Sequence, residues 1–233
     1  MPRLSIEEDF FFKGFLNYKV SNKTYLTDIK ESIKESWLSK DRYKYWIKGY
    51  SSASDLKNID YKLKDKLFSL FDPRLTSQFI SDMTGHEYFY GGILVRMLHS
   101  GRSYFGGWHR DYYKYGKAKT IGPFPPTIKL IYTPRIFNEN NPKQFKFAVS
   151  SNIRYSNNSI IDTKFLPIFL KKYTHKINDN YALIFNGFGL HTPVRNMSRE
   201  ASLRIIINFH PIYNREKFLS FVKGKKTILM PDI

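Results

Sequence analysis

Three residues of this chain have the types and the spacing to hold a metal ion together. His109 and Asp111 are separated by one residue, and side chains two positions apart on an extended strand point to the same face. His191 lies 82 residues after His109 (191 minus 109), at the end of an apolar run that is typical of another strand. Two imidazoles and one carboxylate leave about three positions of a six-coordinate ion open. The sequence therefore predicts a metal centre in which these three residues are both the ligands and the catalytic residues.

The composition narrows the chemistry of this centre. The chain has no cysteine, which excludes disulfides, thiolate ligands and cysteine nucleophiles. Any metal must therefore be held by nitrogen and oxygen, and two His with one carboxylate is the set that holds Fe(II) in non-haem oxygenases. A His-x-Asp pair alone would occur by chance in roughly a quarter to a third of such chains, so the surrounding residues must decide.

One such residue is Arg204, which lies inside the apolar run 203–207. A buried guanidinium without a partner is costly, so an arginine at this position needs a partner. Asn196 and Ser198 lie between His191 and Arg204 and are polar neighbours of the same centre in sequence.

Taken together, these residues resemble the phytanoyl-CoA dioxygenase-like family of Fe(II)- and 2-oxoglutarate-dependent oxygenases. The resemblance covers roughly residues 90 to 210 and rests on a Trp-His-x-Asp element, an apolar strand after a turn, a distal His, and the Asn, Ser and Arg that follow it. Here these are 108–111, 179–185, His191, Asn196, Ser198 and Arg204. The family's Gly-Ser-His segment reads Val-Ser-Ser-Asn at 149–152, and Arg110 stands where Gln is frequent. The prolyl-hydroxylase-like branch therefore stays open as an alternative.

The resemblance implies the cofactors. His109, Asp111 and His191 would hold Fe(II), Arg204 would bind the distal carboxylate of 2-oxoglutarate, and Asn196 and Ser198 would complete the cosubstrate site. With O2 as the other cosubstrate, the expected reaction is hydroxylation with release of succinate and CO2. A further polar contact to the cosubstrate is expected on an early strand, and the candidates for it are Arg96, His99, Lys129 and Tyr132.

The substrate is expected to be a small molecule or a carrier-bound group, and an anionic one is an option. Residues beside the ligands in sequence are the candidates for contacting it: Arg102, Tyr104, Arg110, Tyr112 and Arg195. The remaining histidines have no partner pattern and are expected on the surface or in packing positions: His86, His99, His175 and His210.

The hydrophobic pattern predicts a mainly β protein with flanking helices, built on a double-stranded β-helix (jelly-roll, cupin-like) core. Helices are expected from Thr27 or Asp28, from Asp55, and from Pro73 to Gly85. Strands are expected at 92–98, 107–112, 127–132, 144–149, 182–185 and 203–209, whereas 162–173 is ambiguous because Pro167 interrupts it. We expect a single domain over 1–233, with helical support at 1–87, the core at 88–212 and a C-terminal extension at 213–233.

The formal charge of +18 raises nucleic acid as a partner, but the basic residues are scattered and no nucleic-acid motif is present. Nucleic acid is therefore not favoured, although the charge leaves it open. The alternative function is a non-catalytic double-stranded β-helix protein that binds a ligand or nucleic acid through its basic surface. The acidic N-terminal segment and the lack of a run of about 18 apolar residues predict a cytoplasmic protein without membrane insertion.

Overall fold

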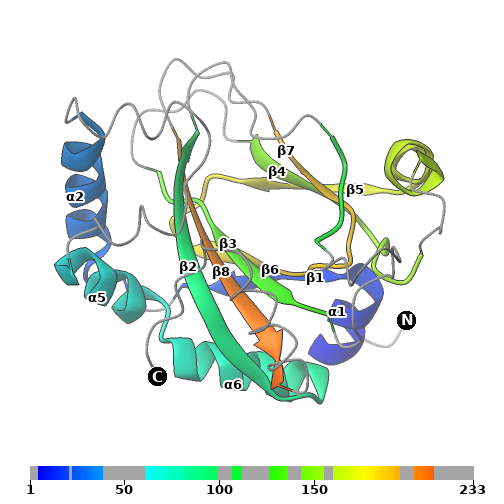
Figure 1. The fold of residues 1–233 in the computed structure, drawn as a ribbon, viewed down its shortest axis with the longest axis horizontal. Coiled ribbons are helices and arrows are strands. Elements are labelled where there is room, and N and C mark those ends of the chain that lie inside the picture. The colour runs from blue at the N-terminus through cyan, green and yellow to red at the C-terminus, as the bar shows by residue number, and fades with distance from the viewer. Residues whose placement is uncertain are drawn as a thin grey trace, which may run out of the picture.

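A computed structural model describes residues 5–20, 23–38, 61–98, 107–111, 126–135, 143–154, 160–194 and 202–212. Two antiparallel sheets face each other (Figure 1). The larger sheet has the order β1 (Phe15–Lys19), β6 (Tyr181–Asn186), β3 (Ile128–Tyr132), β8 (Ser202–Pro211) and β2 (Tyr88–Leu98). The smaller sheet has the order β5 (Lys172–Lys176), β4 (Lys143–Ala148) and β7 (His191–Pro193). This architecture confirms the mainly β, jelly-roll prediction.

The alternation of side chains along β8 defines two layers of core. Leu203, Ile205 and Ile207 belong to the cluster between the larger sheet and the helices. Ile206 belongs instead to the cluster between the two sheets, together with Phe145 of β4. Because successive strand residues point to opposite faces, the even-numbered residues of β8 face the space between the sheets.

Helices line the outer face of the larger sheet (Figure 1). They are α1 (Ile6–Lys13), α2 (Leu26–Leu38), α5 (Tyr61–Leu70) and α6 (Pro73–Thr84). Helix α6 matches its prediction closely: the Asp72 side chain accepts from the first backbone N–H groups, and Gly85 ends the helix at φ 69°. Ile29, Leu67 and Ile80 bring α2, α5 and α6 into the outer core.

Several elements differ from the prediction. Strand β1 lies in a span expected to be helical, and β5 and β7 were not expected at all. The expected strand at 107–112 is reduced, in its described part, to one bridge between His109 and His191. The ambiguous span becomes a π-helix, η1 (Ile161–Phe165), that runs into α7 (Leu166–Phe169) before β5. Residues 55–60 of the second expected helix lie outside the described residues. None of the described helices is long and apolar enough to cross a bilayer.

Candidate metal centre

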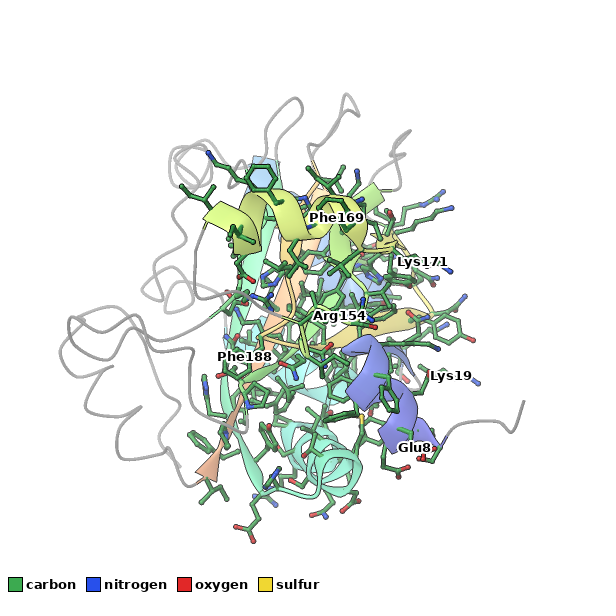
Figure 2. The ribbon with its side chains drawn as sticks, turned by 90° about the vertical axis from the view of Figure 1, so that its right-hand side faces the viewer. Glu8, Lys19, Arg154, Phe169, Lys171 and Phe188 are labelled. Carbon is green, nitrogen blue, oxygen red and sulfur yellow. The ribbon has the colours of Figure 1, made fainter. Side chains whose placement is uncertain are left out.

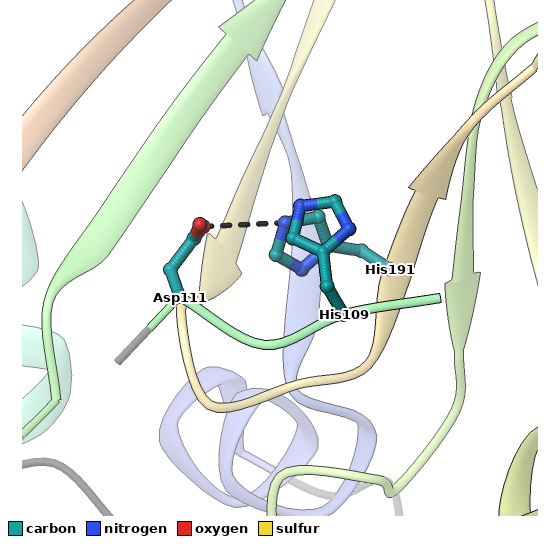
Figure 3. Close-up of side chains that lie close together, drawn as sticks. All are labelled: His109, Asp111 and His191. Carbon is teal, nitrogen blue, oxygen red and sulfur yellow. Dashed lines mark ion pairs between the residues drawn. The ribbon is translucent and has the colours of Figure 1, made fainter. Parts of the chain in front are cut away.

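The structure brings His109, Asp111 and His191 together (Figure 3). Each offers one ligand atom, and these atoms all lie within 4.8 Å of one another. Nε2 of His191 lies 3.2 Å from Oδ2 of Asp111. Neighbouring ligands of an octahedral ion, each about 2.1 Å from it, are about 3 Å apart. The spacing therefore suits a metal that binds all three from one side.

The backbone holds these residues together although they are distant in sequence. His109 and His191 exchange both backbone hydrogen bonds, each at 3.0 Å. The N–H of Asp111 donates to the carbonyl of Gly187 at 2.9 Å. Gly187 has to be a glycine here, because a Cβ would lie 2.7 Å from the Thr127 carbonyl oxygen. His109 thus lies beside β7, at the edge of the smaller sheet.

Both imidazoles are oriented by carbonyl groups. Nδ1 of His109 lies 3.1 Å from the Gly107 carbonyl oxygen, and Nδ1 of His191 lies 2.9 Å from that of Gly189. A carbonyl can only accept, so Nδ1 carries the proton in both rings and Nε2 is the nitrogen able to bind a metal. The ring of His191 also packs against Phe145 and Phe185, with centroids 5.2 and 5.0 Å away.

The charge states also suit a cation. Burial, followed by the neighbouring His191, lowers the pKa of His109 to about 4, so its imidazole is neutral at pH 7. Burial opposes ionisation of Asp111, but Lys129 and His191 outweigh it and hold the pKa of this carboxyl well below its usual value. A neutral imidazole and a carboxylate are the forms that ligate metals.

Lys129 is the residue that balances this carboxylate. Its Nζ lies 2.7 Å from Oδ2 of Asp111. Of the expected further contacts, Lys129 therefore lies at the centre, whereas Tyr132 does not. Tyr132 is three positions further along β3, packs in the outer core and donates to the carbonyl of Asp179. The period of two along a strand puts these residues on opposite faces.

Arg204 faces the space between the sheets, as its even position on β8 requires. It is buried, and its charge acts on His175 of the smaller sheet, where it adds to burial in lowering the pKa of His175 to about 4. Arg204 lies four residues along β8 from Asn208, which pairs with Lys129. Four residues of strand span about 13 Å, which is the approximate separation along β8 between Arg204 and the position opposite Lys129.

The sequence predicts Arg110 among the substrate contacts, but the structure places it elsewhere. Its side chain is buried and points away from the ligands on either side of it, as expected from alternation. Nε and Nη2 form a two-pronged pair with Asp162 of η1, at 2.6 and 2.7 Å. The other N–H groups donate to the carbonyls of Ser151, Phe188 and Arg154.

This network, which we call the Arg110 clamp, fixes the segment that carries His109 and Asp111. A guanidinium has five N–H donors, and five acceptor contacts are present. They join the segment of His109 and Asp111 to the turn before His191 and to η1. Ser151 extends the clamp, because its hydroxyl accepts from the N–H of Leu190 at 2.7 Å. The sequence carried no signal that would separate such a buried arginine from an exposed one.

The other predicted residues are distributed as follows. Asn196 and Ser198 lie outside the described residues, as do His99, Arg102, Tyr104, Tyr112 and Arg195. The backbone register pairs Arg96 with Arg204. His86 is exposed, while His175 and His210 are buried and bond to Thr133 and Thr127.

No family model and no curated protein matches this sequence. Solved structures do share its fold. AviO1 from Streptomyces viridochromogenes Tue57 superposes with a TM-score of 0.61 at 12% identity, covering 88% of this chain and 92% of that one. SnoN is a non-haem alpha-ketoglutarate-dependent epimerase from nogalamycin biosynthesis. It superposes with a TM-score of 0.60 at 12% identity, covering 88% of this chain and 79% of that one. SnoK, the carbocyclase described for the same biosynthesis, superposes with a TM-score of 0.59 at 10% identity, covering 88% of this chain and 83% of that one. The chain therefore shares the fold of these three structures.

Proposed function

We propose that this protein is a non-haem Fe(II)- and 2-oxoglutarate-dependent oxygenase that uses O2 and releases succinate and CO2. One observation carries the proposal. His109, Asp111 and His191 converge on one point between the sheets, with both Nδ1 atoms committed to carbonyls and both Nε2 atoms available as ligands. When bound there, Fe(II) would supply the activation of O2.

The chain's own groups would bind and orient the cosubstrate. Arg204 is the candidate for the distal carboxylate of 2-oxoglutarate, because a planar guanidinium matches a carboxylate with two parallel hydrogen bonds. Lys129 adds a second positive charge beside the ligands. Phe145 and Phe185 form an apolar wall against His191, which would exclude water from that side.

Hydroxylation of a small-molecule or carrier-bound substrate is the reaction we propose, by a member of the phytanoyl-CoA dioxygenase-like branch. This finer assignment rests on the sequence pattern around 108–111 and 191–204. SnoN and SnoK, described as an epimerase and a carbocyclase, indicate that the fold accommodates other outcomes. An anionic substrate group would have to be met by Arg102, Arg195 or Lys129, since Arg110 is committed to Asp162.

The test is formation of succinate from 2-oxoglutarate by the purified protein with Fe(II), ascorbate and air. Slow, substrate-independent succinate release is expected, and Asp111→Ala should abolish it. Arg135→Met, which alters an exposed cation away from the ligands, is the matched control and should retain it. Absence of succinate, together with nucleic-acid binding that falls steeply with salt, would favour the non-catalytic alternative.

A further inference from the structure

The helical segment 160–169 has an unusual distribution of side chains. It exposes large apolar residues and buries an acid: Asp162 is only 4% exposed. The exposed residues, which we call the apolar face, are Ile160 (54%), Ile161 (48%), Phe165 (51%), Ile168 (65%) and Phe169 (80%). Ile153, at 40%, is exposed in the preceding loop. In a water-facing helix the opposite arrangement is normal, so this surface calls for a partner.

The inner side of this segment is already committed. Asp162 is held by Arg110, and Leu166 and Leu170 pack in a small cluster with Trp108. The apolar face is therefore not the unfilled half of the protein's own core. In Figure 1 the yellow-green coil lies at the edge of the molecule, beside the smaller sheet, and Figure 2 labels Phe169 on that coil.

Positive charge surrounds the apolar face. Residues 143–176 contain seven Lys or Arg and a single acidic residue, the buried Asp162. Lys164, Lys171, Lys172 and Arg154 are exposed. Figure 2 shows Lys171 next to Phe169 and Arg154 on the same side of the molecule. Within the described part of 143–176, exposed apolar side chains are thus combined with exposed cations and with no exposed acid. This is the pattern of helices that lie in the interface of anionic membranes.

We propose that the apolar face of residues 160–169, with its surrounding lysines, docks on an anionic lipid surface. A second copy of this chain is a poorer fit, because both copies would bring the same cations to the contact in a protein of charge +18. The apolar residues also project from a short helix at the edge of the fold, which suits insertion between lipid headgroups. Docking of this kind is peripheral and needs no membrane-spanning helix.

The test is co-sedimentation of the whole chain with vesicles of phosphatidylcholine, with or without 30 mol% phosphatidylglycerol (on the order of the anionic content of natural membranes). Binding is expected to the anionic vesicles and to be at least tenfold weaker to the neutral ones. The double variant Ile168→Glu/Phe169→Glu should lose at least tenfold in binding. Lys171→Glu/Lys172→Glu should lose selectivity for the anionic lipid.

A matched control lies elsewhere on the surface. Leu75 on α6 is 69% exposed, and α6 lies at the opposite end of the molecule from the apolar face in both views. Leu75→Glu should therefore bind vesicles as the unaltered protein does. Circular dichroism and thermal unfolding check that each variant is folded, and succinate formation is not part of the readout.

Three results would overturn the proposal. The first is no binding to anionic vesicles by the unaltered, folded protein. The second is undiminished binding by Ile168→Glu/Phe169→Glu, which would reduce the effect to net charge. The third is a concentration-dependent dimer that the same double variant abolishes, since this would assign the apolar face to a second copy of the chain.

Discussion

Lys129 and His191 approach the same oxygen of Asp111. Nζ of Lys129 lies 2.7 Å from Oδ2, and Nε2 of His191 lies 3.2 Å from it. Without a metal, the lysine is the cation that keeps this carboxylate ionised inside the protein. A divalent ion bound to Asp111 would share the carboxylate with an ammonium group, and like charges that close repel. We therefore expect Lys129 to weaken the binding of a metal ion at Asp111.

The first prediction concerns this competition. Lys129→Met should tighten Co(II) binding by about tenfold, because it removes a positive charge beside the ion. Lys129→Arg should bind as the unaltered protein does. Lys146, on β4 between the inward-facing Phe145 and Phe147, points the other way, so Lys146→Met is the control. The measurement is a titration followed by the visible absorption of Co(II), and equal or weaker affinity in Lys129→Met would contradict the assignment.

A second prediction separates cosubstrate binding from metal binding. Arg204→Met should weaken 2-oxoglutarate binding by about a hundredfold while leaving Co(II) affinity unchanged, because a charged, two-pronged hydrogen bond is lost. Arg204→Lys should recover only part of the loss, since an ammonium cannot make the paired contact. Isothermal titration calorimetry without O2 measures the dissociation constants of both Co(II) and 2-oxoglutarate. A parallel loss of metal and 2-oxoglutarate binding would show that Arg204 only supports the fold.

The third prediction addresses the clamp. Arg110→Met leaves Asp162 buried without its cation and should destabilise the protein by about 3–5 kcal/mol. The double variant Arg110→Met/Asp162→Leu should recover much of this, because neither charge is then buried alone. Urea unfolding monitored by circular dichroism measures both. If Arg110→Met lowers the free energy of unfolding by less than about 1 kcal/mol, the pair of Arg110 and Asp162 is more exposed to water than the structure shows.

A fourth prediction is the pH dependence of the metal-free protein. The pKa of His175 falls to about 4, mainly through burial and further through Arg204, against about 6.5 in an unfolded chain. Between these values the unfolded state binds the extra proton. The contribution of neutral His175 to the free energy of unfolding is therefore complete above about pH 6.5. It is lost as the pH falls toward 4, and the loss amounts to up to about 3 kcal/mol.

His175→Gln should flatten that part of the stability profile, measured by urea unfolding at several pH values. The exposed His86 offers the control, and His86→Gln should follow the unaltered protein. A variant curve parallel to the original would mean that His175 titrates normally in the folded state.

The shared face of His109 and Asp111 and the strands of the larger sheet could be predicted because both depend on local patterns. His109 and Asp111 share a face by the period of a strand, and the apolar runs of β3, β6 and β8 exceed what a loop would contain. Helix α6 could be predicted in the same way, since Asp72 and Pro73 begin it and Gly85 ends it. Each of these signals lies within a few residues of the feature that it predicts.

The elements that escaped prediction depend on distant partners. Strand β1 has five residues and exists through pairing with β6, about 165 positions away. Strand β7 has three residues, and its position comes from β4 and the His109 bridge. Arg110 is buried because Asp162 and carbonyls from 151, 154 and 188 meet it, and no local pattern specifies that meeting.

The most direct test of the proposed centre is the absorption spectrum of the protein with Fe(II) and 2-oxoglutarate in the absence of O2. A chelating 2-oxo acid on Fe(II) gives a weak visible charge-transfer band, so adding 2-oxoglutarate to the Fe(II) protein should produce one. His191→Ala should lose the band, and Arg204→Met should require far more 2-oxoglutarate to produce it. If the unaltered protein binds Fe(II) yet shows no band, or if His191→Ala retains the band, the central claim is wrong.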